Sequence, residues 1–284
     1  MTDTLDRPVL SRRQFAGASA AGLALAGAAP TAFAAGDVVE TDVVVPTQDG
    51  QADAALFHPA GKGKWPAVVV FADALGLRPE FREMGRRLAA EGYVVLVPNP
   101  FYRTRKAPVL EGPFDFANPA DRAKLAELTK PLNADTTTRD GLAYLAFLDA
   151  QKVVDTRRKA GVVGYCMGGP YTMRAAAAAP GRVGAGCSFH GGGVVTDQPD
   201  SPHLLVPKMK ASFYFGIAAN DDQRQPDQKD KLKAAFAAAG LPATVVVYDG
   251  CQHGWCVKGM PVYNEAGAER AWAEMVKLYK QTLA

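Results

Sequence analysis

The sequence predicts an α/β protein built on a doubly wound, mostly parallel sheet with an antiparallel hairpin at its N-terminal edge. Several short apolar runs, such as residues 66–71, are continuous and not alternating, which is typical of strands covered on both faces. They alternate along the chain with helical patterns that serve as single crossovers. The 284 residues, 48% of them hydrophobic, suffice for one large domain with a substantial core.

The first 34 residues resemble a twin-arginine export signal and are set apart from the fold. Arg12 and Arg13 precede a weakly apolar Ala/Gly/Leu run, and an Ala-x-Ala cleavage site ends at Ala34. We therefore expect the twin-arginine export machinery as a partner, a periplasmic or extracellular mature protein, and no stable membrane anchor after cleavage. An ordinary Sec leader or an uncleaved tether is the alternative. Residues 35–284 are expected to form a single domain.

Bulk charge and cysteine content narrow the function classes. The formal net charge of +3 gives no reason to expect nucleic acid or a membrane surface as a partner. Four cysteines in a chain of this length are no disulfide framework. We expect neither a cofactor nor a metal, and a small molecule as the binding partner.

The elements are justified in chain order. Two alternating stretches separated by Thr47-Gln48-Asp49-Gly50 predict the edge hairpin. A helix with an apolar stripe follows the first buried strand and stops at Gly92. Residues 104–118 are rich in Pro and Gly and predict a loop over the carboxyl edge of the sheet. The predicted strands cover residues 38–45, 52–57, 66–71, 93–97, 161–163, 183–189, 211–217 and 243–248. The predicted helices cover residues 79–91, 119–130, 135–150, 170–179, 226–239 and 264–282.

The stretch Gly164-Tyr165-Cys166-Met167-Gly168 lies between a predicted strand and a predicted helix. This is the context of a nucleophile elbow, with cysteine in place of the usual serine. A strained turn at the nucleophile needs small residues two positions before and after it. The helix N-terminus next to the sulfur favours a thiolate. A cysteine between glycines can also be a small buried residue without a catalytic role. The presence of a base and an orienting acid elsewhere in the chain must therefore distinguish the two interpretations.

A base and an orienting carboxylate are available in α/β-hydrolase order. His253 alone among four histidines follows the last strand, where this order places the base, and the neighbouring Trp255 is positioned to exclude water. The strand before it ends near Asp221, which we favour as the orienting acid; Asp222 is the rival. The backbone N–H groups of Met167 and Ala74 are the expected oxyanion donors.

Together these motifs resemble the dienelactone hydrolase (carboxymethylenebutenolidase-like) family of α/β-hydrolases. The resemblance rests on Gly-x-Cys-x-Gly-Gly, the strand-end Asp, His-Gly-Trp and residues 93–103, and it extends over about residues 40–282. It implies cleavage of an ester or lactone through a Cys166-His253-Asp221 triad and a thioester intermediate. It further implies an acid beside the thiol, matched by Asp73, and a substrate-carboxylate ligand, matched by Arg103. A second arginine of the family is replaced by Val257-Lys258, and Lys does not reproduce bidentate carboxylate binding.

Other interpretations of the same residues stay open. Cys251, His253 and Cys256 are possible zinc ligands, although no Cys pair elsewhere completes the set. A Cys251–Cys256 disulfide would pin the histidine loop. The glycine run after His190 is interpreted as a turn, since an oxyanion loop of this type precedes the nucleophile. The alternative function is an exported, non-catalytic ligand-binding or thiol-sensing relative.

Overall fold

The protein is described by a computed structural model that covers Met1, residues 38–110 and residues 112–283. Apart from Met1, the predicted export signal lies outside these residues. Within them, one eight-stranded sheet has the order β1-β2-β4-β3-β5-β6-β7-β8. The strands are β1 (Val38–Thr47), β2 (Gly50–Pro59), β3 (Ala67–Phe71), β4 (Val94–Pro98), β5 (Ala160–Tyr165), β6 (Val183–Phe189), β7 (Ser212–Ala218) and β8 (Ala243–Tyr248).

The pairing confirms a mostly parallel sheet with an antiparallel N-terminal edge. Strand β1 pairs with β2, and β2 with β4, in antiparallel register. All remaining neighbours, from β4 to β8, are parallel. Every residue of β3, β4 and β5 is buried, because helices cover both faces of the central strands.

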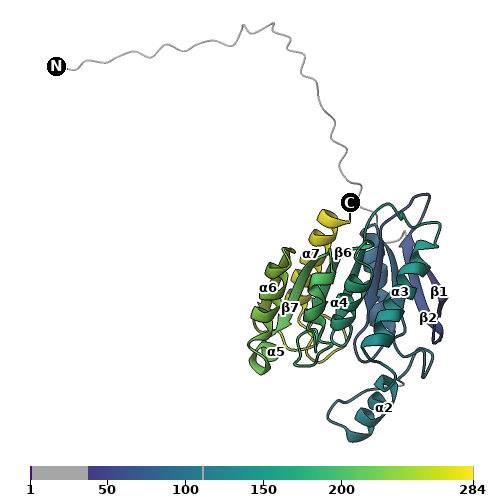
Figure 1. Cartoon of the computed structure of the whole chain (residues 1–284), viewed down its shortest axis with the longest axis horizontal. Coiled ribbons are helices and arrows are strands. Elements are labelled where there is room, and N and C mark those ends of the chain that lie inside the picture. Colours follow the sequence, from purple (N-terminus) through teal and green to yellow (C-terminus); the bar gives the residue numbers. More distant parts are fainter. Residues whose placement is uncertain (2–37, 111, 284) are drawn as a thin grey trace. The chain divides into compact units, whose positions relative to one another are not determined.

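Helices form a layer on each face of the sheet (Figure 1). They are α1 (Pro79–Ala90), α2 (Pro119–Thr129), α3 (Ala134–Asp149), α4 (Gly168–Ala178), α5 (Ala219–Arg224), α6 (Gln228–Ala238) and α7 (Glu265–Thr282), with the 3-10 helix η1 (Pro202–Lys208). Apolar side chains of α1 and α7 pack into one core cluster, represented by Phe81 and Met275. Those of α3, α4 and α6 pack into the other, represented by Tyr144, Met173 and Phe236.

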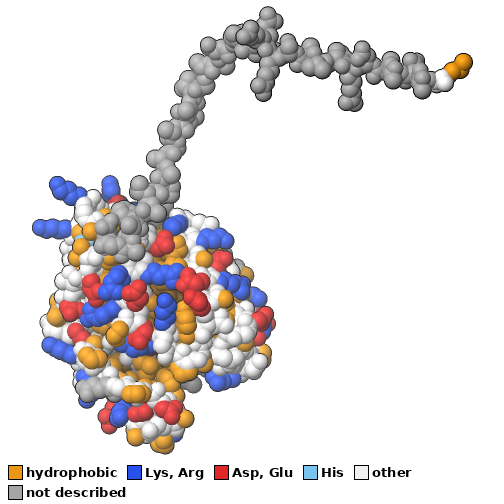
Figure 2. Space-filling model, turned by 180° about the vertical axis from the view of Figure 1, so that it is seen from behind, with side chains coloured by type: hydrophobic (Ala, Val, Ile, Leu, Met, Phe, Trp, Pro, Cys, Tyr) orange, Lys and Arg blue, Asp and Glu red, His pale blue; other side chains and the backbone are white. Residues whose placement is uncertain are grey.

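The surface over α1 carries mixed charge. Arg82 pairs with Glu40 and Asp42 of β1, and Arg86 pairs with Glu40 and Glu83. Figure 2 shows acidic and basic side chains interspersed on this face, while hydrophobic side chains gather toward the end that carries α2. No helix within the described residues combines the length and the apolarity needed to cross a bilayer.

Two short helices were not predicted. The six residues of α5 follow β7 without a connecting loop, where we expected only a turn at the end of the strand. The segment 202–208 forms η1 between the predicted strands 183–189 and 211–217, where the sequence predicted no helix. Both are too short for the 3.6-residue periodicity that marks longer helices in a sequence.

Candidate active site

Cys166 occupies the sharp turn between β5 and α4, and its φ angle of 53° lies in the left-handed region. A residue other than glycine rarely adopts this backbone conformation unless the surrounding structure stabilises it. A Cβ atom added to Gly164 would come within 2.0 Å of the Gly168 carbonyl oxygen, and one added to Gly168 would come within 2.3 Å of the Phe71 carbonyl oxygen. Only glycine fits at these two positions, so the expected strained elbow is present.

Backbone hydrogen bonds hold the elbow in place, and two backbone N–H groups near it have no acceptor. The Cys166 N–H donates to the Phe189 carbonyl oxygen and to Nδ1 of His190, both at 3.1 Å. The Cys166 carbonyl oxygen accepts from Gly169 at 3.0 Å and from Gly192 at 3.2 Å. Among the described residues, the N–H groups of Ala74 and Met167 have no hydrogen-bond acceptor. Two free N–H groups are the minimum that an oxyanion site requires.

His253 and Asp221 lie together at the same edge of the sheet. Nδ1 of His253 is 2.6 Å from Oδ2 of Asp221, the first acid of α5. Asp222 points to Lys229 instead, at 2.6 Å and 2.9 Å. The His253 N–H donates to Oδ1 of Asn220 at 2.9 Å, a contact that the sequence did not reveal. The structure therefore brings Asp221, and not Asp222, to the imidazole.

The environment of His253 favours its protonated form. Burial alone would lower the pKa of His253, but the hydrogen bond to Asp221 and the nearby Cys166 side chain outweigh burial and raise it to about 10. The Asp221 carboxylate on Nδ1 thus stabilises the charged form of the imidazole.

His190 is a further residue of the site that sequence reasoning assigned only to a turn. Its side chain is buried, and its ring lies 5.1 Å from the His253 ring and 5.0 Å from the Trp255 ring, centroid to centroid. Burial, together with the charge on His253, lowers the pKa of His190 well below 6.5. Since Nδ1 accepts the Cys166 N–H, the neutral ring carries its proton on Nε2. The signal in the sequence was its place directly after β6.

Trp255 packs against the ring of His190. It has no exposed surface, and it stacks on Tyr248 with ring centroids 4.8 Å apart. A side chain without exposed surface has none to offer a substrate. Its contact is with the ring of His190, so it packs the histidine pair and does not line an open face of the site.

The acid expected beside the thiol is paired with another residue. Asp73 accepts two hydrogen bonds from Arg78, at 2.6 Å and 2.9 Å, and one from the Leu75 N–H at 2.9 Å. It is 6% exposed. The turn that carries Ala74 is therefore fixed by an ion pair across its own ends, and Asp73 has an immediate role in shaping this loop.

Arg103, the expected ligand for a substrate carboxylate, already binds two carboxylates of the protein. It donates to both oxygens of Asp140 at 2.7 Å, and to Oδ2 of Asp49 at 3.0 Å and 2.7 Å. These bonds use four of its five N–H donors. Burial opposes the charge of Arg103, but the two acids outweigh it and raise its pKa. A substrate carboxylate would have to displace one of them.

The remaining cysteines lie outside the reactive centre. Cys187, Cys251 and Cys256 are buried, whereas Cys166 is partly exposed, and all four are free thiols. The alternative Cys251–Cys256 disulfide is thus not formed in this structure. No group of three or more His, Cys, Asp or Glu side chains within the described residues is arranged to hold a metal.

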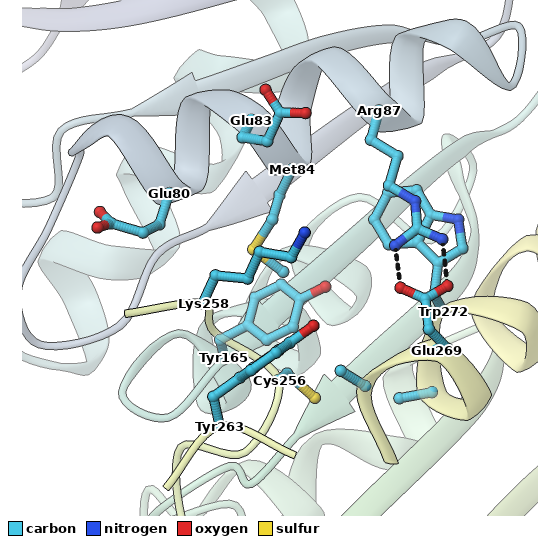
Figure 3. Close-up of a pocket in the computed structure, with 12 residues that line it drawn as sticks. Glu80, Glu83, Met84, Arg87, Tyr165, Cys256, Lys258, Tyr263, Glu269 and Trp272 are labelled. Carbon is cyan, nitrogen blue, oxygen red and sulfur yellow. Dashed lines mark hydrogen bonds and ion pairs between the residues drawn. The ribbon is translucent and has the colours of Figure 1, made fainter. Parts of the chain in front are cut away.

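A small cavity lies between α1 and α7 (Figure 3). It measures about 90 Å³, and Cys256 and Tyr165 contribute to its wall. Arg87 and Glu269 form a two-pronged ion pair at its rim, at 2.7 Å and 2.6 Å. None of Cys166, Asp221 and His253 lines it, so it is no candidate for the reaction.

The fold and this site define an α/β-hydrolase: a nucleophile elbow, an acid and a histidine in that chain order at the carboxyl edge of one sheet. The sequence model of the Dienelactone hydrolase family matches residues 52–283. The chain belongs to this family, and it is a carboxylic ester or lactone hydrolase.

Individual relatives agree over most of the chain. A protein of Methylorubrum extorquens, provisionally named carboxymethylenebutenolidase, is 29% identical over 282 residues, 96% of this chain and 93% of its own. The carboxymethylenebutenolidase of Rhodococcus opacus is 25% identical over 229 residues, 78% of this chain and 83% of its own. A crystal structure from Klebsiella pneumoniae, provisionally named dienelactone hydrolase, has a TM-score of 0.74 at 22% identity; the match covers 86% of this chain and 99% of that chain.

Proposed function

We propose that the protein hydrolyses an ester or lactone through a Cys166-His253-Asp221 triad and a thioester intermediate. The observations that carry the proposal are the 2.6 Å contact between His253 Nδ1 and Asp221 Oδ2 and the place of Cys166 in the strained turn between β5 and α4. A thiol sensor has no use for the carboxylate, and a binding protein has no use for any of the three.

The proposed reaction has two halves. The Cys166 thiolate attacks the acyl carbon, and the N–H groups of Ala74 and Met167 bind the developing oxyanion. The His253 imidazolium gives its proton to the leaving alkoxide, the C–O bond breaks, and a Cys166 thioester remains. Neutral His253 then takes a proton from water, whose oxygen attacks the thioester. The acid leaves and the thiolate–imidazolium pair is restored. Asp221 orients the ring throughout.

The names of the relatives suggest a lactone as substrate, but this chain departs from a two-arginine carboxylate site. Arg103 is paired with carboxylates of the protein. Where the second arginine is expected, Val257 is buried and Lys258 is exposed. We therefore propose an ester or lactone other than one held between Arg103 and a second arginine at that loop.

The test is turnover of p-nitrophenyl acetate by the mature protein, its Cys166→Ala variant and its His253→Ala variant. We expect both substitutions to lower kcat by at least about 10²-fold, the scale of a lost nucleophile or general base. Mass spectrometry of the quenched wild type should find one added acyl group on Cys166. A Cys166→Ala variant that keeps full activity would exclude this nucleophile, and a wild type that turns over no ester or lactone would favour the sensing or binding alternative.

We also propose that residues 1–34 direct export through the twin-arginine machinery. Replacement of Arg12 and Arg13 by Lys should retain the protein in the cytoplasm with residues 1–34 uncleaved. Fractionation and N-terminal sequencing of the exported form check this; export unaffected by the double substitution would indicate another route.

A further inference from the structure

Arg174 of α4 is a sparsely paired arginine with little exposure. Its side chain is 12% exposed, and its one ion-pair contact among the described residues is with Asp200. The nearest carboxylate is that of Asp200, 3.7 Å away and itself 58% exposed. Burial lowers the pKa of Arg174, and Asp200 and Tyr171 offset this only in part, whereas the partners of Arg103 raise its pKa. The Arg174 nitrogens are not among the enclosed polar atoms that lack a partner, so they are open to solvent and to an incoming anion.

Arg174 lines a cavity that opens next to the nucleophile. The cavity has a volume of about 440 Å³. Its wall includes Met167, whose N–H is a proposed oxyanion donor, and Gly192, whose N–H donates to the Cys166 carbonyl oxygen. The first turn of α3, with its positive dipole end, forms another part of the wall.

The spacing along α4 sets the distance between this charge and the sulfur. Within α4, Arg174 lies six positions after Gly168, which corresponds to about 9 Å along the helix axis at 1.5 Å per residue, and Cys166 lies in the turn just before it. A long side chain on a helix points back toward its N-terminus, and hence toward the elbow. Tyr171 lies one turn closer to the elbow, and the charges of both Arg174 and Cys166 act on its hydroxyl. An anionic group reaching Arg174 would therefore sit several bonds from a carbonyl held at Cys166.

We propose that the cavity lined by Arg174 is the binding site for an anionic group of the substrate, so that the enzyme prefers esters, thioesters or lactones bearing a carboxylate several bonds from the scissile carbonyl. The inference rests on the proposed function. Arg174, and not Arg103, supplies the open guanidinium, because the donors of Arg103 already bind Asp49 and Asp140. Asp200 is the counter-ion that the substrate carboxylate replaces.

The test uses two p-nitrophenyl esters of matched shape: mono-p-nitrophenyl glutarate, and the same compound with its distal carboxylate methylated. We expect the wild type to prefer the anionic ester in kcat/KM by at least about 10-fold, the worth of one charge-assisted hydrogen bond. Arg174→Gln should abolish this preference by raising KM for the anionic ester at least about 10-fold, with the neutral ester changed by less than about 2-fold. Arg174→Lys should retain part of the preference.

Two further variants complete the series. Asp200→Asn should raise kcat/KM for the anionic ester, because a competing carboxylate is removed. Lys277→Gln, a remote and exposed change of the same charge, should leave both esters unchanged. Equal losses on both esters in Arg174→Gln, or a preference that survives it, would overturn the inference.

A binding measurement separates this inference from the proposed function. Calorimetry with glutarate and the Cys166→Ala variant, which needs no turnover, should detect binding that is lost in Cys166→Ala/Arg174→Gln. If the wild type hydrolyses neither ester while this binding persists, the proposed function fails and the anion site stands. If both esters turn over while glutarate binds the two variants equally, the anion site fails alone.

Discussion

Replacing Arg103 by Met distinguishes a structural arginine from a substrate ligand. Arg103 is 9% exposed and Asp140 is 7% exposed, and their two-pronged contact joins the loop after β4 to α3. Without Arg103, the Asp140 carboxylate stays buried with the Tyr102 hydroxyl, at 2.8 Å, as its remaining side-chain partner. Breaking a buried ion pair on one side costs about 3–5 kcal/mol. We expect about 3 kcal/mol, because the neighbouring Asp49 is open to water and adds little.

For a domain of this size, that loss lowers Tm by about 6–12 °C. Thermal unfolding followed by circular dichroism measures it on the mature protein, with Arg157→Met as a control. Arg157 also binds an aspartate, but it is 86% exposed, so its Tm should stay within about 2 °C of the wild type. Arg103→Met/Asp140→Leu should recover part of the loss, since no orphaned charge remains. An unchanged Tm, with a raised KM for anionic esters only, would refute the reasoning and show that Arg103 binds the substrate carboxylate.

Three further predictions follow from the elbow and the histidine loop. The pKa of His253 is raised in the folded protein from 6.5 to about 10, so its contribution to stability is complete below about pH 6.5 and is lost as the pH rises through 10. Urea unfolding should show this decline, and Cys166→Ala should make it shallower; an equal decline would remove the sulfur as a partner. Gly164→Ala should abolish activity and lower Tm, because its Cβ has no room, whereas Gly181→Ala, with no atom within 4 Å, should change neither; an active Gly164→Ala enzyme would disprove the steric argument. Asn220→Ala should lower kcat about 10-fold with KM little changed, since the His253 N–H loses its acceptor; unaffected kinetics would show that the loop holds without it.

The main residues of the site could be predicted from the sequence because the elbow is a local motif and the acid and histidine follow a fixed chain order. The elbow follows from steric necessity at Gly164 and Gly168, which any reader of the pattern can recognise. The pairing of Asp221 with His253 followed from chain order and the shared carboxyl edge of a parallel sheet. Continuous apolar runs located the buried strands, although their ends shifted by a few residues.

What the sequence did not predict was the partner of each charged side chain. Asp73 was placed by its loop, but nothing in the sequence indicated that Arg78, five residues on, would bind it. Arg103 meets an aspartate 54 residues earlier in the chain and another 37 residues later, a convergence that only the folded sheet creates. The place of His190 in the site was not predicted, because the glycine run that follows it is typical of turns.

The burial of three of the four thiols has a practical consequence. Burial raises the pKa of Cys187, Cys251 and Cys256, which keeps them protonated and out of reach of solutes. Cys166 is the one cysteine that is not buried. An alkylating reagent applied to the native enzyme should therefore titrate competent molecules one for one. The same asymmetry should make peroxide oxidise Cys166 first, well before the three buried thiols and the core around them.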